Sequence, residues 1–355
     1  MPVCFNSNQF NEDQWTGAKW PFVKPAATAH SRSNRSISIG LINNMSDGAI
    51  GATERQFLSL LDSASDGIEI RLSLYSLPGV PRSESGARYV KNFYSSAENL
   101  WNTRLDGLIV TGREPLAPSL TDEPYWDSFT KVLEWARYNT LSTVWSCLAA
   151  HAALLHMDGI GRIKSQCKHC GVFECAQVAD HPLTAGAPSR FRFPHSRWNG
   201  IPEESLTSCG YSILTRTADA GVDTFIKQDE SLFVFFQGHP EYESDTLLLE
   251  YRRDVGRYLR GESAAYPSLP RSYFDHETAI QLTELQQEAM SHPNEELVAR
   301  VSAVLGKGNI RNTWHPAASC IYRNWLEYIC AQKQMWLKGR SLSLQRPRSA
   351  VCLPL

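Results

Sequence analysis

Short apolar runs alternate with helix-forming segments through the first half of the chain, and this alternation limits the fold more than any other feature. Four runs rich in apolar and β-branched residues predict strands, at 36–42, 68–75, 108–112 and 141–146. Two segments between them, 54–61 and 125–138, have helical spacing of their apolar residues. Strands that alternate with helices form a parallel sheet covered on both faces. We therefore predict an α/β fold with a mostly parallel, doubly wound sheet.

The second half of the chain changes in character. Residues 212–217, 224–228 and 231–236 predict consecutive antiparallel strands, and 246–260 predicts a helix. A Pro-rich linker begins near residue 262, and it is followed by expected helices at 277–291, 295–305 and 315–337 and a polar tail at 340–355.

These changes predict three parts of the chain. Residues 1–35, rich in Pro, Asn and Ser, form an irregular N-terminal arm. Residues 36–261 form the α/β catalytic domain. Residues 262–355 form a Pro-rich linker and a helical C-terminal extension, which we interpret as an added lid or oligomerisation element.

Cys147 lies at the junction between the predicted strand at 141–146 and a strongly helix-forming segment, 148–157. A thiol at a helix N-terminus favours the thiolate form, because the first-turn N–H groups and the helix dipole stabilise the negative charge. The same N–H groups can hold a developing oxyanion. A cysteine at such a junction is more often a small buried core residue. Cys147 is therefore a candidate nucleophile only if a base lies nearby.

A candidate base follows the apolar run at 231–236. Gly238 ends that strand, and His239 and Glu241 come directly after it. Residues i and i+2 of an extended segment point the same way, so the carboxylate of Glu241 can orient the imidazole of His239. A solvated loop is the alternative for an isolated His-Pro-Glu. With Cys147, the pattern indicates a Cys–His–Glu triad of nucleophile, base and orienting carboxylate.

Composition excludes several classes of partner. The 355 residues carry a formal net charge of −2, which gives no electrostatic reason to expect nucleic acid or an anionic membrane surface. No apolar run approaches the ~18 residues of a membrane span, and the N-terminus lacks the pattern of a secretory signal. Nine cysteines, spread thinly along the chain, fit a reducing compartment. We therefore expect a cytoplasmic protein that acts on small molecules, with a homodimer left open.

The pair Cys167 and Cys170, with Cys175 close behind, suggests a metal or redox site. A structural zinc site needs a second ligand pair, and the sequence has no other Cys-x-x-Cys. We therefore expect no metal here and interpret the three thiols as incidental residues beside a strand.

Several motifs between Ile37 and Gly261 together match one known family. They are Ile42–Met45, Thr53–Leu58, Asp106–Gly112, Tyr125–Trp126, Cys147 with Ala152–Leu154, Lys168 before Gly171–Phe173, Pro194–Arg197, Gln237–Tyr242 and Glu250–Asp254. With these motifs the chain resembles the homoserine O-acyltransferases of methionine biosynthesis, which are related in fold to class I glutamine amidotransferases. The resemblance implies a flavodoxin-like, class I glutamine amidotransferase-like fold.

The resemblance also implies an activity, ping-pong transfer of an acyl group from acyl-CoA to the hydroxyl of L-homoserine. In this family the cysteine carries the acyl group as a thioester, the histidine is the general base and the glutamate supports it. These roles fall on Cys147, His239 and Glu241, in agreement with the triad inferred from geometry. No bound cofactor or metal is implied, since acyl-CoA is a cosubstrate.

The resemblance places substrate binding at four further positions. Lys168, Ser196 and Arg253 match the amino-acid-binding residues of the family, and Arg197 lies beside Ser196 in the same motif. A guanidinium such as that of Arg253 suits the carboxylate of a zwitterionic substrate.

The position that selects the acyl group falls in the turn after 108–112, where a small residue is associated with succinyl and a glutamate with acetyl. Ala117 is small, which favours succinyl, while Glu114 lies nearby, so acetyl remains an alternative donor. L-serine likewise remains an alternative acceptor. The family usually has Trp-Gly after the cysteine, whereas this chain has Leu148 and Ala149.

Two rival functions remain open from the sequence. A glutamine amidotransferase or cysteine hydrolase would use the same triad on the same fold, although the absence of glycine on either side of Cys147 argues against it. A catalytically silent binding protein is the other alternative.

Overall fold

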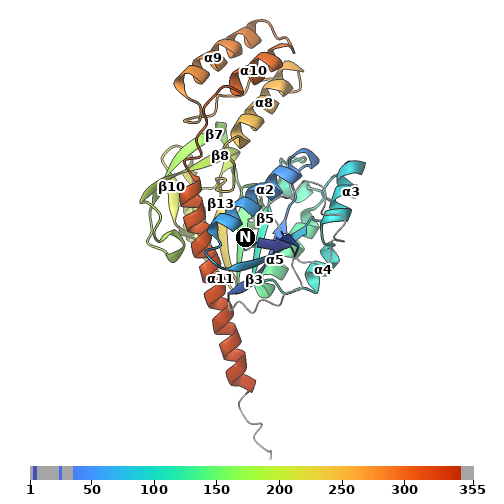
Figure 1. Cartoon of the computed structure of the whole chain (residues 1–355), viewed down its shortest axis with the longest axis vertical. Coiled ribbons are helices and arrows are strands. Elements are labelled where there is room, and N and C mark those ends of the chain that lie inside the picture. The colour runs from blue at the N-terminus through green and yellow to red at the C-terminus, as the bar shows by residue number, and fades with distance from the viewer. Residues whose placement is uncertain (1–2, 6–23, 26–34, 345–355) are drawn as a thin grey trace, which may run out of the picture.

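The computed structural model describes residues 3–5, 24–25 and 35–344 (Figure 1). Its main sheet has nine strands in the order β2-β1-β4-β3-β5-β6-β13-β12-β9. In that order the strands are Lys24–Pro25, Val3–Phe5, Glu69–Tyr75, Ser36–Ile42, Gly107–Thr111, Ser142–Ser146, Leu232–Phe236, Thr224–Gln228 and Ser212–Ile213. The strands from β2 to β13 pair in parallel, and β12 and β9 add antiparallel partners at one edge. This order confirms the predicted α/β class with a mostly parallel sheet.

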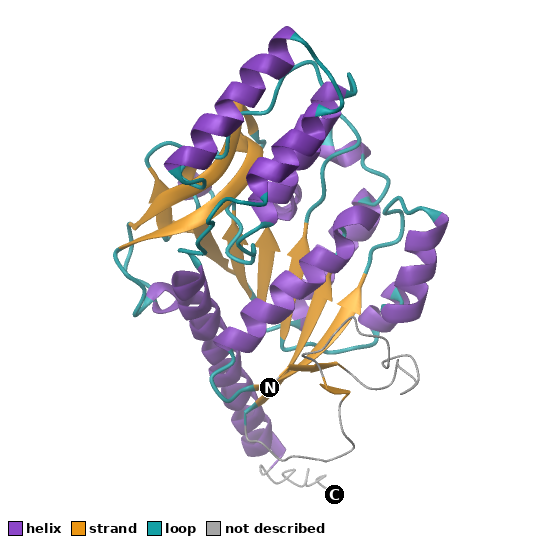
Figure 2. Ribbon diagram, turned by 45° about the horizontal axis from the view of Figure 1, so that its top comes forward, coloured by secondary structure: helices purple, strands orange, loops and turns teal. Residues whose placement is uncertain are grey.

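Helices cover both faces of this sheet (Figure 2). On one face α2, Asp47–Ala64, and α11, His315–Leu344, share a core cluster with the apolar side chains of β3 and β4. On the other face α5, Trp126–Asn139, and α6, Leu148–Asp158, pack over β5, β6 and β13. The short helices α3, Glu84–Phe93, and α4, Ala97–Trp101, fill the connection between β4 and β5. The sheet is therefore doubly wound, as predicted.

A second, antiparallel sheet of four strands has the order β11-β10-β7-β8. Its strands are Gly221–Val222, Thr215–Thr217, Ile163–Gln177 and Arg190–Gly200, with η3, Pro182–Thr184, between the two long ones and α7, Glu203–Ser208, after them. The single strand predicted at 212–217 is therefore wrong in part. Residues 212–213 stay in the main sheet and 215–217 cross to the second sheet, because the N–H of Leu214 bonds to Thr224 while its carbonyl accepts from Val178.

Three helices form a separate cluster at one end of the molecule, beyond β7 and β8 (Figure 1). They are α8, Thr246–Leu259, α9, His276–Ser291, and α10, Leu297–Leu305, close to the predicted bounds. The chain then returns to the main sheet through α11. There Trp325 is buried and its indole N–H donates to the hydroxyl of Ser142 at 2.9 Å.

The predicted irregular arm contributes two short edge strands, β1 and β2, to the main sheet. Val3 is apolar and pairs with Ile70 of β4, which buries its side chain. The rest of the arm, like residues 345–355 of the polar tail, lies outside the described residues.

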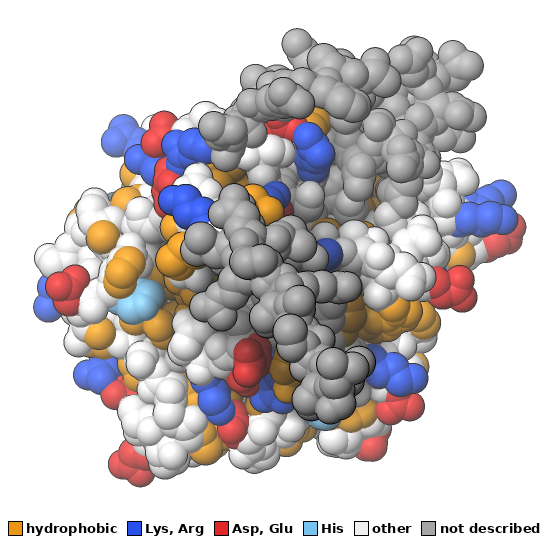
Figure 3. Space-filling model, turned by 90° about the horizontal axis from the view of Figure 1, so that it is seen from below, with side chains coloured by type: hydrophobic (Ala, Val, Ile, Leu, Met, Phe, Trp, Pro, Cys, Tyr) orange, Lys and Arg blue, Asp and Glu red, His pale blue; other side chains and the backbone are white. Residues whose placement is uncertain are grey.

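The described helices include none long and apolar enough to cross a membrane. Basic and acidic side chains are interspersed on the face seen in Figure 3. This mixture agrees with a formal net charge near zero and offers no extended basic surface on the drawn part of that face.

Candidate active site

Cys147 occupies the sharp turn between β6 and α6. Its backbone has φ 50° and ψ −109°, a region that residues with a side chain rarely adopt. The turn is held by the N–H of Cys147, which donates to the carbonyl of Phe236 at 2.7 Å. The thiol therefore stands at the carboxyl edge of the sheet, at the N-terminus of α6, as the sequence predicted.

Parallel pairing brings the candidate base to the candidate nucleophile. Ser146 at the end of β6 is in register with Phe236 at the end of β13, so the residues after each strand emerge side by side. His239 Nδ1 lies 2.8 Å from Glu241 Oε1, which also accepts from the hydroxyl of Ser146 at 3.3 Å. With Nδ1 bound to the carboxylate, His239 has Nε2 left for Cys147.

Charges keep the imidazole of His239 protonated. Burial lowers its pKa, but the carboxylate of Glu241 and the charge and hydrogen bond of Cys147 outweigh burial and raise the pKa well above 6.5. The ring also stacks on Tyr242, with centroids 4.2 Å apart. The arrangement is suited to a thiolate–imidazolium pair.

A cluster of charged side chains lies beside this pair, between β7, β8 and α8. Ser196 donates to Glu250, and Tyr242 donates to the other oxygen of Glu250 at 2.7 Å. Lys168 Nζ lies 3.0 Å from Asp254, and Arg253 lies 2.8 Å from the same carboxylate. A hydrogen-bonded path thus runs from the ring that stacks on His239 to Glu250 and Ser196.

The comparisons with known proteins decide the family. The family model described as homoserine O-succinyltransferase matches residues 12–336. A homoserine O-succinyltransferase from Rhodopseudomonas palustris is 45% identical over 302 residues, which cover 85% of this chain and 91% of that protein. One from Methylorubrum extorquens is 42% identical over 329 residues, which cover 93% of this chain and 95% of that protein.

The chain belongs to the homoserine O-succinyltransferase family. This confirms the family and the enzyme class, an acyltransferase, that the motifs predicted, and it disfavours the two rival functions. The family match runs through α8–α10 and most of α11, beyond the end of the resemblance seen in the sequence. The domain boundary at residue 261 stays a prediction.

Solved structures with a similar chain path include two glutamine amidotransferases. One from Thermotoga maritima has a TM-score of 0.46 at 11% identity and covers 83% of this chain and 98% of that chain. One from Methylobacillus flagellatus has a TM-score of 0.45 at 14% identity and covers 83% of this chain and 95% of that chain.

The side chains at the substrate-binding positions implied by the homoserine O-acyltransferase resemblance all have partners in the structure. Lys168, Ser196 and Arg253 meet around the two carboxylates of α8, as described above. Arg197 is buried, and its three nitrogens donate to His195 Nδ1, the carbonyl of Asn199 and the carbonyl of Ala220. Its guanidinium is thus held in place. Burial lowers the pKa of Arg197, and the charge of nearby Cys147 offsets part of this effect.

Ala117, the predicted acyl-selecting residue, lies in the loop after β5. Its N–H and that of Leu116 both donate to Glu123 Oε1, at 2.8 and 2.7 Å. The structure thus connects this loop to a buried carboxylate that sequence reasoning did not single out.

Sequence reasoning placed Glu250 in a family motif but gave it no role in the site. The available signal was its helical spacing from Arg253, since residues three apart share one face of a helix. A carboxylate and a guanidinium on one face can hold the two ends of a zwitterion.

The predicted Cys167–Cys170 pair lies on β7, with Cys167 exposed and Cys170 buried. A different group, Cys175, His195 and Asp223, places three candidate metal-ligand atoms within 4.8 Å of one another. The oxygens of Asp223 are already used, because Oδ1 accepts from the N–H of Gly238 and Oδ2 from two threonine hydroxyls. We interpret this group as a hydrogen-bonded support for the His239 loop.

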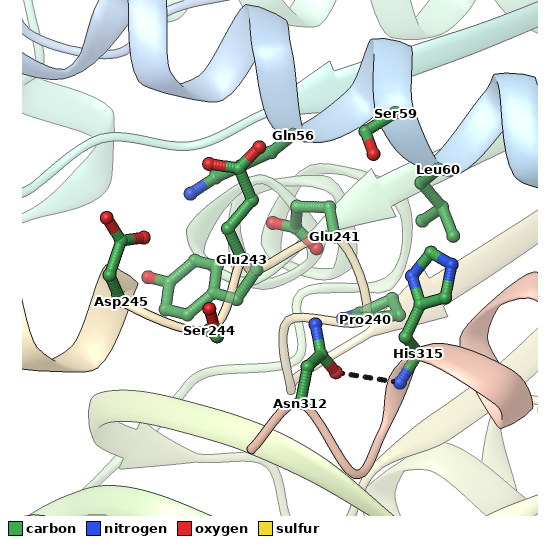
Figure 4. A pocket seen from close by; sticks show the side chains of 11 residues that line it. Gln56, Ser59, Leu60, Pro240, Glu241, Glu243, Ser244, Asp245, Asn312 and His315 are labelled. Atoms are coloured by element: carbon green, nitrogen blue, oxygen red, sulfur yellow. Dashed lines mark hydrogen bonds between the residues drawn. The ribbon is translucent and has the colours of Figure 1, made fainter. Parts of the chain in front are cut away.

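A cavity of about 320 Å³ lies behind that loop (Figure 4). It is lined by α2, by residues 240–245 and by the start of α11, where the N–H of His315 donates to Asn312. Glu241 borders the cavity, and its Oε2 makes no hydrogen bond within the described residues. The C-terminal part of the chain therefore helps to shape the surroundings of the predicted orienting carboxylate.

Proposed function

We propose that this protein transfers an acyl group from acyl-CoA to the hydroxyl of L-homoserine through a thioester on Cys147. The proposal depends above all on one observation, the convergence of Cys147, His239 and Glu241 at the paired ends of β6 and β13. Family membership supports the chemistry, since the relatives are homoserine O-succinyltransferases.

In the first half-reaction the thiolate of Cys147 attacks the thioester carbonyl carbon of acyl-CoA. The first-turn N–H groups of α6 lack helical acceptors and can hold the oxyanion that forms. When the bond to the CoA sulfur breaks, the imidazolium of His239 gives its proton to the leaving thiolate. The products are free CoA and an acyl-cysteine.

In the second half-reaction neutral His239 takes the proton from the homoserine hydroxyl through Nε2. The oxygen attacks the acyl-cysteine carbonyl, and the thiolate of Cys147 leaves. The enzyme returns to the thiolate–imidazolium state, which the carboxylate of Glu241 stabilises. Each half-reaction exchanges one acyl bond for another, so no oxidant or external reductant is needed.

The charged cluster beside the triad suits the acceptor. Homoserine carries an ammonium and a carboxylate, and we assign the ammonium to Glu250 and the carboxylate to Lys168 and Arg253. Ser196 and Tyr242, which both donate to Glu250, orient that carboxylate. Burial favours the neutral amine of Lys168, but neighbouring Glu250 and Asp254 help to raise its pKa, so it stays positively charged.

We place the enzyme in the cytoplasm, where the thiol must stay reduced. The eight cysteines of the described residues are all free, which supports a reducing compartment. Small-molecule substrates follow from the proposed reaction, and a homodimer remains open.

The test is the intact mass of the protein after incubation with acyl-CoA and no acceptor. Wild type and Cys167→Ala, which removes an exposed cysteine, should gain one acyl group, and Cys147→Ala should gain none. An acyl adduct that persists on Cys147→Ala would refute the assignment. Release of ammonia from glutamine by the wild type would favour the amidotransferase alternative instead.

A further inference from the structure

Two buried guanidinium nitrogens in the region around the turn of Cys147 have no hydrogen-bond partner among the described residues. Arg113 Nη1 and Arg162 Nη1 are shielded from solvent and make no hydrogen bond within the described part of the chain. Burying part of a cation without a partner is unfavourable, and it costs less when an anion binds there. Arg197, the third arginine of this region, differs because all its nitrogens are occupied.

The position of Arg113 follows from its neighbours in the chain. Gly112 packs so closely on the start of α6 that an added Cβ would lie 2.5 Å from Leu148 Cβ and 2.7 Å from the backbone nitrogen of Ala149. On the other side, Glu114 lies 3.2 Å from Arg257 of α8. Arg113 therefore lies between a residue that packs on the start of α6 and a residue that pairs with α8.

Arg162 reaches the same region from the connection between α6 and β7. Burial lowers its pKa, while the charges of Glu123, Tyr125 and Cys147 raise it, which places its guanidinium near all three. Burial and the charge of Glu123 raise the pKa of Tyr125 to about 12, while the charges of Arg113 and Arg162 lower it. The two arginines thus share one neighbourhood, which includes the loop of Ala117.

The charges of this neighbourhood do not balance. Glu123 is the buried carboxylate here. Its Oε1 accepts from Leu116 and Ala117, and its Oε2 makes no hydrogen bond within the described residues. Two guanidiniums against one carboxylate leave a positive excess beside the thiol that would carry the acyl group.

We propose that Arg113 and Arg162 bind the terminal carboxylate of the acyl chain, and that these two guanidiniums recognise the dicarboxylic donor, succinyl-CoA, after which the family is named. The inference rests on the proposed function, because it needs the acyl group on Cys147. It assigns the choice between succinyl and acetyl to charge recognition by two arginines, in addition to the small side chain of Ala117.

The test compares donors in the first half-reaction alone. Acylation of Cys147 is followed by quenched intact mass with succinyl-, butyryl- and acetyl-CoA, without acceptor. Butyryl has the same number of carbons as succinyl and lacks the carboxylate, so it isolates the charge. The wild type should react fastest with succinyl-CoA.

The variants are Arg162→Gln and Arg113→Gln, with Arg88→Gln on the exposed surface of α3 as control. Each of the first two should lose at least about tenfold in acylation by succinyl-CoA and change by less than about twofold with acetyl-CoA. Arg162→Lys should recover only part of the loss, because an ammonium cannot make the paired bonds of a guanidinium.

Equal losses with all donors would mean that the arginines only stabilise the thiolate, and would overturn the proposal. A wild type that acylates as fast from butyryl-CoA as from succinyl-CoA would overturn it as well, whether or not the variants fold. If the wild type forms no adduct from any donor, the proposed function itself fails. An adduct from acetyl-CoA with no preference for succinyl-CoA would contradict this inference alone.

Discussion

At the scale of single residues, the reactivity of the site depends on where one proton lies. His239 carries it, because Glu241 and Cys147 together outweigh the effect of burial on the imidazole. The same carboxylate oxygen also receives the hydroxyl of Ser146, which ties its position to the strand that carries Cys147. The charge state of the pair is therefore set by residues that follow two neighbouring strands.

Glu241→Gln should slow the labelling of Cys147 by iodoacetamide about tenfold near neutral pH. Loss of the carboxylate lowers the pKa of His239, so the imidazolium deprotonates at a lower pH and the thiolate loses its cation. The labelling rate, followed from pH 5 to 9, should therefore reach half its maximum at a higher pH than in the wild type.

Glu243→Gln is the matched control, since Glu243 borders the cavity behind the loop and makes no hydrogen bond to His239 in the described structure. Identical pH profiles for Glu241→Gln and the wild type would show that Glu241 does not set the charge of the imidazole.

At the scale of elements, the site depends on how closely the end of β5 approaches α6. Asn44, at the end of β3, joins this edge as well, because its N–H and side-chain amide both bond to Thr111. Gly112 then contacts the first turn of α6, where no side chain fits. The loop that carries Arg113 and Ala117 is positioned by this contact.

Gly112→Ala should lower the free energy of unfolding by about 1–3 kcal/mol, because the new methyl group must displace backbone of α6. It should also reduce the rate of Cys147 acylation, since the first-turn N–H groups move. Urea unfolding and the acylation assay together check both effects.

Gly48→Ala is the control, as Gly48 lies in α2 with no atom within 4 Å of an added Cβ. The free energy of unfolding of Gly48→Ala should be unchanged or rise by less than about 1 kcal/mol. A Gly112→Ala variant as stable as the wild type would mean that the loop and α6 can move apart at little cost in free energy.

At the scale of the whole molecule, the C-terminal helix is part of the core of the α/β sheet. Trp325 and Ile329 of α11 pack against Gly107 of β5, and Trp325 bonds to Ser142 at the start of β6, the strand that leads to Cys147. The sulfur and its supporting helix therefore belong to one packed unit, although almost 180 residues of chain separate them.

Trp325→Ala should cost about 3–5 kcal/mol of unfolding free energy, the range for removal of a buried aromatic side chain. Because α11 and the sheet share one core cluster, urea unfolding should stay a single transition, measured by both circular dichroism and loss of Cys147 acylation.

Trp198→Ala provides the comparison. Trp198 is half exposed on β8, so its substitution should lower the free energy of unfolding by less than about 1 kcal/mol. Two separate transitions in Trp325→Ala, with the sheet unaffected, would show that α11 folds as an independent unit.

The sequence by itself determined the strands from β4 to β12 of the main sheet, the turn at Cys147 and the His239–Glu241 pair, because these depend on local periodicity. Apolar runs of five to seven residues mark buried parallel strands, and the i, i+2 spacing sets the direction of two side chains. Such patterns involve few residues and can be recognised without knowledge of contacts between distant parts of the chain.

Only the tertiary structure decided the second sheet, the partners of Lys168 and Ser196, and the two arginine nitrogens that lack a partner within the described residues. β7 is 15 residues long but exposes polar side chains through its first half, so its sequence has no apolar run that would predict a strand there. The roles assigned to Glu250, Arg113 and Arg162 depend on contacts with residues that are far away in the chain. The physical reason is that burial and charge balance belong to the packed molecule, and a residue's own neighbours in sequence do not specify them.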